Sequence, residues 1–590
     1  MTKNLNITKS ETMPDALIPI TIGITGHRDI HLDNLALISE QLKTIFKYFK
    51  KQYPDSPLIL ISPLAEGADQ LVANIANELQ IDIYAVLPMP EEEYKKDFDK
   101  ADVKSNFEAL LLIAAHRRVL TEFNPETQRS LCYANVGKWV VDQCDVLIAL
   151  WDGNKNELTG GTGEIVNYAL TGELPSLEQH LNKDWIALQR PVLHIESPRQ
   201  SGHLDTVTNT EINVYHTHKA FEDYKQVDFS KSISEITSLK NINDFNREVD
   251  KQNRANGYPL LDKNENEFPD HLYFIHELYL KTDLVANEFQ ATLKRYTFLF
   301  YSLTTALMIT LLLYFRILPL TIVLAIYVLI YIATILISIR IKNSDYQQKY
   351  HLYRIIGELS RLFFFFSLSK EKKGKESIKR ESVLNNYREL QYITRKLGSD
   401  NEWVVDVLRK IKLFETLHPS NNTFEQPMLL VKKHWIEDQY NYFTKAQARD
   451  EKKLRRLDLI GIALFAISLL CGISLFIISL TTYVVPELLK PIVNMIIAVS
   501  AGFGGIIKTY TYTMGYGELS GRYKLMSTLF GNSLTKMNKK NSNHDAVFEQ
   551  LWWEAVMENV EWFSLKNSRL IKTIDLKKIV QNIMRFSKSF

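Results

Sequence analysis

Four long apolar runs constrain the fold of this 590-residue chain more than any other feature. An α-helix rises about 1.5 Å per residue, so about 20 apolar residues cross the hydrocarbon core of a bilayer. A helix buried in a soluble protein rarely needs this length. The sequence therefore predicts four transmembrane helices, at residues 297–315, 317–339, 459–485 and 488–507.

Each pair of runs is separated by only a few residues, which predicts two tight hairpins. Arg316 and Lys490 are the cations near the turns, and Lys490 can extend its charge to the headgroups. Because Lys and Arg flanking a span stay in the cytosol, both termini and the N-terminal region are expected to be cytosolic. The many cations at the hairpin bases are Lys294, Arg295, Arg340, Lys342, Lys452, Lys453, Arg455, Arg456 and Lys508.

Two matched landmarks indicate an internal duplication. Leu-Lys-Arg at 293–295 and Leu-Arg-Arg at 454–456 precede the two hairpins, and Gly-Glu-Leu-Ser follows each one, at 357–360 and 517–520. The two units are expected at residues 269–420 and 430–590. Each also carries amphipathic segments typical of cytosolic helices, at 403–417, 552–563 and 570–586.

Two other stretches of the first unit stand out. Residues 362–366, LFFFF, are too apolar for a solvated face and are expected to be buried between subunits or repeats. Residues 370–375, KEKKGK, read as a solvated loop that could also contact lipid headgroups.

The N-terminal third alternates between short apolar runs and helical patterns, which predicts a mostly parallel sheet with helices on both faces. Residues 201–268 are polar and read as a linker with candidate helices near 216–224 and 245–254, followed by an amphipathic helix at 270–296. The expected strands are 18–25, 58–61, 81–87, 117–120, 145–151 and 191–196.

Ligands of such sheets bind beyond the carboxyl ends of the strands. The loops expected there include a glycine-rich turn at 159–163, placed between a strand and a helix. Glycines admit a ligand close to the backbone, and the N-terminus of the next helix favours an anion such as phosphate. The candidate ligand-binding residues are Gly26, His27, Arg28, Glu66, Gly67, Asp69, Pro88, Asp152, Gly160, Gly161, Thr162, Gly163 and Glu164.

Each candidate also has a purely structural interpretation. Arg28 could be a surface residue, Asp69 could cap a helix, and the glycine turn could serve only tight packing. Charge excludes one class of partner: Lys and Arg number 70 and Asp and Glu 68, so a general nucleic-acid surface is not indicated. The cysteines, none in a CxxC pattern, argue against a structural zinc or disulfide framework and predict a reducing compartment; they are Cys132, Cys144 and Cys471.

The residues also carry a resemblance to known domains. ITGHRD at 24–29, PLAEGADQLVA at 63–73, AVLPMP at 85–90 and DVLIALWDG with GGTGEIV within 145–166 resemble SLOG domains. That superfamily is Rossmann-like and includes nucleotide phosphoribohydrolases of the LOG type. The hairpin units resemble SLATT domains, two-helix membrane effectors that accompany SLOG sensors in bacterial conflict systems. The resemblance covers about 18–200 and 265–590.

The resemblance implies an antiphage membrane effector of the bacterial inner membrane. Its SLOG domain would sense a nucleotide-derived messenger made by a partner enzyme, such as a cyclic ADP-ribose-like or other cyclic nucleotide. The chain departs from the LOG pattern because Glu164 follows Gly163 directly, which leaves phosphoribohydrolase activity in doubt. Two alternatives stay open: a membrane-tethered nucleotide-processing enzyme that uses Glu66 or Glu164, and a scaffold that the hairpins only anchor.

The fourth apolar run is the candidate for the route through the membrane of a homo-oligomeric pore. It combines interior polar residues with small residues that permit close helix packing, and the first hairpin offers no comparable run. These residues are Asn494, Ser500, Gly502, Gly504 and Gly505. The alternative is that Asn494 bonds a neighbouring helix and the glycines only pack.

Overall fold

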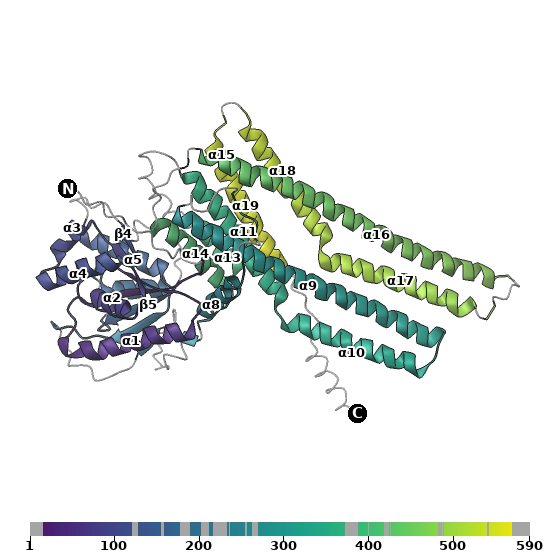
Figure 1. The fold of residues 1–590 in the computed structure, drawn as a ribbon, viewed down its shortest axis with the longest axis horizontal. Helices are drawn as coiled ribbons and strands as arrows, with labels where there is room; N and C mark the ends of the chain where they lie inside the picture. Colours follow the sequence, from purple (N-terminus) through teal and green to yellow (C-terminus); the bar gives the residue numbers. More distant parts are fainter. Residues whose placement is uncertain are drawn as a thin grey trace.

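The structure is a computed structural model, shown in Figure 1. It describes residues 16–120, 128–154, 158–177, 189–201, 212–215, 233–234, 236–253, 257–261, 269–371, 388–398, 401–417, 424, 426–481, 486–487, 489–539 and 542–568. The helices expected at 216–224 and 570–586, and nearly all of the 370–375 stretch, lie outside these residues.

A seven-stranded sheet forms the N-terminal domain, with the strand order β4-β3-β2-β1-β5-β6-β7. All neighbouring strands are parallel except β6 and β7, which are antiparallel. The predicted mostly parallel sheet is confirmed, and each of the six expected strands is present. The strands are β1 (Ile20–Gly26), β2 (Leu58–Ser62), β3 (Asp82–Leu87), β4 (His116–Val119), β5 (Val146–Trp151), β6 (Val192–Glu196) and β7 (Ile212–Tyr215).

Helices cover both faces of the sheet because its central strands are apolar on both sides. In β2, Leu60 belongs to one core, while Ile59 and Ile61 belong to the other. The first core contains side chains of α1 (Leu35–Gln52), α2 (Ala68–Glu78) and α4 (Ala101–Ile113). The second contains those of α5 (Arg129–Gln143) and α6 (Thr162–Thr171). Short turns are α3 (Glu91–Tyr94) and the 3-10 segments Leu32–Asn34, Lys95–Asp97 and Pro175–Leu177.

The sheet extends past residue 200 into the segment interpreted as a linker. β7 pairs with β6, and α8 (Thr237–Asp250) then packs on the sheet domain. The Asn246 side-chain amide accepts a hydrogen bond from the Ile18 N–H at 2.9 Å and donates one to the Ile18 carbonyl at 2.8 Å. Residues 201–268 therefore include parts of the folded domain as well as connecting chain.

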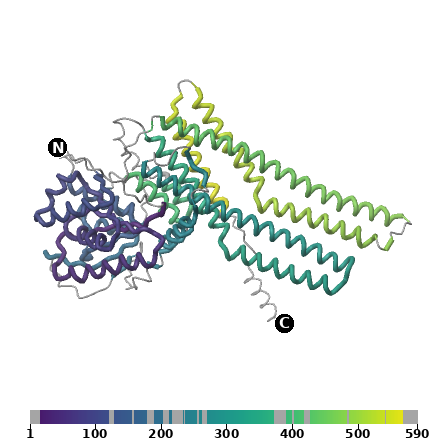
Figure 2. Tube along the Cα trace, in the orientation of Figure 1, coloured from purple at the N-terminus to yellow at the C-terminus, as the bar shows by residue number. Residues whose placement is uncertain are grey.

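Long helices form the rest of the chain, and four are long and apolar enough to cross a membrane. α9 (Asp270–Arg316) joins the predicted amphipathic helix and the first apolar run without a break, and α10 (Thr321–Asn343) lies alongside it. α16 (Asp438–Ser479) lies alongside α17 (Leu489–Met514) in the same way. Both pairs project from the same side of the protein (Figure 2).

The apolar residues of these helices face outward. Leu329 on α10 is 66% exposed, and Phe476 on α16 is 65% exposed. Side chains of this kind are stable when exposed only if lipid surrounds them. The third run is shorter as a helix than expected: α16 ends at Ser479, although the run was predicted to continue to residue 485. Leu480 and Thr481 are no longer helical, and residues 482–485 lie outside the described residues.

The second helix of each pair is followed by a less apolar helix, and a single left-handed residue directly precedes that helix. Asp345 (φ 48°) precedes α11 (Tyr346–Lys370), and Gly515 (φ 65°) precedes α18 (Tyr516–Met537). These helices carry the two Gly-Glu-Leu-Ser motifs and pack against α9 and α16, respectively. The remaining helices are α13 (Arg388–Leu397), α14 (Glu402–Leu417), α15 (Pro427–Val431), a π-helical turn (Lys432–Glu437) and α19 (His544–Ser568).

The apolar stretch at 362–366 lies between the two repeats, as predicted. The Phe365 ring stacks on Trp435, with ring centroids 5.9 Å apart, and the Phe366 ring lies 4.5 Å from Trp552. The indole N–H of Trp552 donates a hydrogen bond to the Leu362 carbonyl at 2.8 Å. Both tryptophans belong to the second repeat, so these contacts join the halves of the chain.

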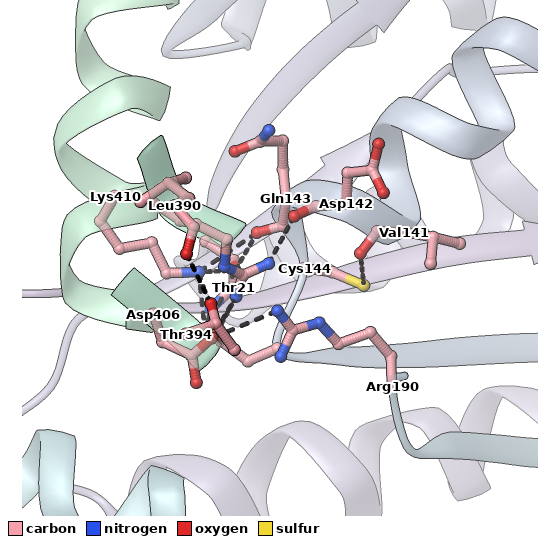
Figure 3. A network of polar contacts seen from close by, with 12 residues as sticks. Thr21, Val141, Asp142, Gln143, Cys144, Arg190, Leu390, Thr394, Asp406 and Lys410 are labelled. Carbon is pink, nitrogen blue, oxygen red and sulfur yellow. Dashed lines mark hydrogen bonds and ion pairs between the residues drawn. The ribbon is translucent and has the colours of Figure 1, made fainter. Parts of the chain in front are cut away.

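A buried group of charges, which we call the junction cluster, joins the sheet domain to α14 (Figure 3). It consists of Asp145, Arg190, Asp406, Arg409 and Lys410. The Arg409 guanidinium contacts Asp406 at 2.6 Å and Asp145 at 3.3 Å, and the Lys410 ammonium contacts Asp145 at 2.9 Å. Asp145 and Arg190 directly precede β5 and β6, so the cluster lies at the amino edge of the sheet.

We predict that Asp145→Ala lowers the free energy of unfolding of the sheet domain and α14 by about 3–5 kcal/mol, because it leaves Arg409 and Lys410 buried without this partner. Asp244→Ala is the control: its carboxylate pairs with Arg247 on the surface, and such pairs contribute at most about 1 kcal/mol. Urea unfolding of the detergent-solubilised protein, followed by tryptophan fluorescence, measures both. Equal losses in the two variants would contradict the importance of the cluster.

Candidate functional site

The loops that follow β1, β2, β5 and β6 meet at the carboxyl edge of the sheet. The His27 N–H donates to the Leu150 carbonyl at 3.1 Å, and the Ala68 N–H donates to the His27 carbonyl at 3.0 Å. The Gln200 N–H donates to the Asp29 carbonyl at 2.8 Å. The sheet edge at which the sequence predicts a ligand site therefore consists of loops that are hydrogen-bonded to one another.

His27 and Asp152 bond to each other and are buried. The Asp152 N–H donates to His27 Nε2 at 3.0 Å, and the Arg199 guanidinium lies 3.3 Å from the Asp152 carboxylate. Burial, reinforced by the charge of Arg199, lowers the pKa of His27, which favours the neutral ring. Burial acts to raise the pKa of Asp152, but hydrogen bonds from Asn154 and the contact with His27 hold it below its usual value. These two predicted residues thus fix the loops in place.

Gly67 and Gly160 are required by the backbone. Gly67 has φ 84°, and a Cβ there would lie 2.3 Å from the Arg28 carbonyl oxygen. Gly160 has φ 73°, and a Cβ would lie 2.7 Å from the Ala134 nitrogen. Left-handed backbone of this kind strongly favours glycine. A Cβ on Gly26 or Gly161 would also come within 3 Å of neighbouring atoms, so all four glycines permit close packing of the edge.

Glu164 stabilises the glycine turn. Its carboxylate accepts the Gly160 N–H at 2.7 Å and the Ser176 N–H at 3.0 Å. Thr162 and Gly163 form the first residues of α6, where N–H groups have no preceding helical carbonyl to bond. The Gly160 N–H is thus bonded to Glu164, and the Gly161 N–H donates to the Leu158 carbonyl at 2.8 Å, so the N–H groups of Thr162 and Gly163 are those left at the start of α6.

Arg28 is the exposed cation of this edge. Its guanidinium lies over the Tyr133 ring, 5.0 Å from the ring centroid, and forms no ion pair with a carboxylate among the described residues. Tyr133 also touches the glycine turn, because a Cβ on Gly160 would lie 2.9 Å from Tyr133 Cβ. Tyr133 thus connects the cation to the turn, and the two predicted anion-binding features share one neighbour.

Asp69 lies in the first turn of α2, near Arg28 of the loop that follows β1. Burial raises its pKa to about 7, against the opposing effects of a hydrogen bond from the Ala65 N–H and the charge of Arg28. Glu66 is half-buried in the preceding loop, and Pro88 is buried just after β3. The structure therefore places all the predicted edge residues at the ends of the predicted strands or in the adjoining helices.

Several residues of the edge were missed from sequence. Tyr133 lies on a helix, and Arg199 follows the last predicted strand, where the rule that placed the other loops would have found it. The buried ring of Tyr94 packs 6.1 Å from that of Tyr133. Among the described residues, no group of three or more His, Cys, Asp or Glu side chains is placed to hold a metal ion.

The small residues of α17 have different neighbours. A Cβ on Gly502 would lie 2.2 Å from Met308 Sδ of α9, and one on Gly504 would lie 3.2 Å from the Phe465 ring of α16. A Cβ on Gly505 would meet no atom within 4 Å. The Ser500 hydroxyl donates to the Ile496 carbonyl of its own helix at 2.6 Å, and Asn494 is half-buried. Two of the glycines thus hold α17 against its neighbours.

The fold and this edge define an α/β domain with a glycine-rich sheet edge that carries the exposed Arg28, joined to four apolar helices. No protein-family model matches the chain, and a search of curated proteins finds no significantly similar one.

Asp69→Asn is predicted to stabilise the protein above pH 7 and to leave its stability nearly unchanged near pH 4. The carboxyl has a folded-state pKa of about 7 against 3.8 in a free chain, so the native state binds the extra proton between these values. Stability that depends on Asp69 is therefore lost as the pH rises through this range. Melting temperatures of both proteins from pH 4 to 8 test this, and parallel pH profiles would contradict it.

Proposed function

We propose that the chain is a membrane effector whose Rossmann-like, SLOG-like domain senses a nucleotide-derived messenger. The four apolar helices form two SLATT-like hairpins in a bacterial inner membrane, and both termini are cytosolic. Messenger binding shifts a homo-oligomer toward a state that disrupts the membrane. The resemblance of the motifs supports the class of protein, and the geometry of the sheet edge supports an anionic ligand.

The observation that carries the proposal is the position of Arg28. Arg28 and the glycine turn before α6 have Tyr133 as a common neighbour, and we infer that the guanidinium binds a phosphate bidentately while N–H groups at the start of α6 bind the same anion. Tyr133, already in contact with this cation, offers an aromatic face of the kind on which a nucleotide base stacks. Two carboxyl groups interact electrostatically with Arg28. Asp97 pairs with the Arg129 guanidinium at 2.7 Å, and Asp69 accepts the Ala65 N–H at 3.3 Å, so both have other partners within the protein.

The sensor interpretation is favoured over an enzyme for a specific reason. A catalytic carboxylate must reach the reacting group of a substrate. Both Glu164 oxygens accept backbone N–H groups that shape the turn, so this residue serves structure. A scaffold alone would need no exposed Arg28 at this edge.

A route between the two parts is also available. α14 contacts the sheet domain through the junction cluster and also packs against α9 and α11. A ligand changes an equilibrium only by binding its two states with different affinity. Movement of the sheet on α14 would provide such a difference and transmit it to the first membrane helix.

Arg28→Ala is predicted to weaken binding of ADP-ribose or cyclic ADP-ribose by about 1.5–3 kcal/mol, the scale of a charged hydrogen bond. Titration calorimetry of the full-length protein in detergent measures this. Arg117→Ala removes an exposed arginine that bonds the Leu112 carbonyl, far from the turn in sequence, and serves as the control. Binding lost equally in both variants, or in neither, would argue against this site.

Asn494→Leu and Gly504→Leu are predicted to abolish messenger-triggered leakage of dye from liposomes, with messenger affinity preserved. The first removes a polar group of α17, and the second forces α17 away from Phe465 of α16. Gly472→Leu on α16 is the control, since a Cβ there meets no atom within 4 Å. Undiminished leakage at equal protein loading would exclude α17 as the conducting surface.

A further inference from the structure

A cavity of about 650 Å³ lies between the two repeats, where the membrane helices meet the cytosolic ones. Its walls come from α9, α11, α16, α17, α18 and α19, so neither repeat forms it alone. It is separate from the sheet edge, whose residues contribute nothing to its lining.

Five cations line this cavity, and only two of them are paired with a carboxylate in the described part of the chain. Arg449 contacts Asp450 at 2.7 Å, and Lys566 contacts Glu518 at 2.6 Å. The remaining cations, Lys294, Arg295 and Lys453, have no carboxylate partner among the described residues.

Lys294 is repelled by two other cations of the cavity, the unpaired Lys453 and the paired Arg449, and is attracted by Asp450. The Lys294 ammonium is held by a neutral acceptor, the Gln290 side chain, at 2.7 Å. Lys453 lies over the Tyr516 ring, 4.6 Å from its centroid. The cavity therefore holds an excess of positive charge from both repeats, and an anion placed there would relieve the repulsion.

The cavity lies at the level of the membrane surface. Thr297 and Phe298 in its wall begin the apolar run of α9, and Tyr510 and Thr513 lie just beyond the end of the apolar run of α17. Tyrosine and tryptophan gather where a membrane meets water, because their rings are apolar and their polar groups need a partner. The aromatic lining is Tyr350, Tyr442, Tyr510, Tyr516, Tyr523 and Trp562.

We propose that this cavity binds the phosphate headgroup of an anionic phospholipid from the cytosolic leaflet. The cations bind the phosphate, the tyrosine hydroxyls bond the rest of the headgroup, and the acyl chains leave along Phe298 into the bilayer. Lysine near a membrane surface attracts anionic lipid. A cavity lined by several lysines and arginines also fixes the place at which the headgroup binds. This inference rests on the part of the proposed function that has the four helices span a membrane with the sheet domain in the cytosol, and it requires no ligand at the sheet edge.

Occupancy of the cavity would link the repeats. A smaller pocket of about 120 Å³ adjoins it and shares Tyr350, Tyr442 and Tyr523 with it. Arg354 and Glu358 of the first repeat, which pair at 2.6 Å, face that pocket together with Arg522 of the second. A bound headgroup therefore contacts the same tyrosines that line the pocket of this partly buried ion pair.

The test uses full-length protein in detergent, with native mass spectrometry counting bound phosphatidylglycerol against phosphatidylcholine. The double variant K294Q/K453Q removes two unpaired cavity cations and is expected to reduce phosphatidylglycerol affinity about tenfold or more. The matched control K445Q/K452Q removes the same charge from exposed positions of α16 outside the cavity and is expected to retain the parent affinity.

Two further arms identify the source of the phosphate. Dioctanoyl phosphatidylglycerol and inorganic pyrophosphate are titrated separately, with the melting temperature of the parent and both double variants as the readout. Stabilisation by the lipid alone, lost only in K294Q/K453Q, supports the proposal. Equal stabilisation by pyrophosphate would assign the cavity to a soluble phosphate and overturn the lipid source, and equal lipid affinity in both double variants would overturn the site.

Discussion

The balance of buried charge in the junction cluster determines how the two parts of the protein are held together. Lys410 is completely buried, and burial lowers its pKa to about 8 in spite of the neighbouring Asp145. The burial of a charge is costly unless opposite charges and hydrogen bonds compensate it, so Asp145, Asp406, Arg190 and Arg409 must stay in register with it. α14 can consequently dock on the amino edge of the sheet in one arrangement only. The opposite edge stays free, which is where the glycine turn and Arg28 lie.

The sequence was sufficient to predict those helices and strands whose own pattern of apolar residues shows whether they are buried in protein or exposed to lipid. Buried strands such as β2 and β5 are short apolar runs, and membrane helices are long ones, so length separated the two classes. Burial of residues 362–366 followed from composition alone. The junction cluster could not be predicted in this way. Arg409 and Lys410 stand in an amphipathic helix and read as its solvated face, and only the fold brings Asp145 to them from a distant part of the chain. The weakly patterned β7 and α4 were missed because packing, and not their own sequence, stabilises them.

The sheet edge shows a similar division. Its location followed from the order of strands and turns, and Gly67 and Gly160 have the backbone that glycine favours. The role of each side chain did not follow, because hydrogen bonding depends on neighbours from other loops. His27 and Asp152 proved to bond each other, and Glu164 bonds the turn that it follows. Tyr133 lies on a helix, and the sequence of that helix does not indicate that Tyr133 contacts Arg28. A list of candidate residues drawn from the loops therefore identifies the correct edge of the sheet. It does not separate the residues that bond the loops to one another from the exposed residues that could contact a ligand.

The contact between Gly502 of α17 and Met308 of α9 has a consequence for symmetry. It joins the second membrane pair of the chain to the first through unlike surfaces. Since one polypeptide carries both pairs, a closed ring of identical chains contains an even number of pairs, alternating between two kinds. The rotational order of the ring is half the number of helix pairs. The contact between two neighbouring chains in the ring differs chemically from the contact between the two helix pairs of one chain. A substitution in α17 would therefore alter every second contact around such a ring and leave the alternate contacts unchanged.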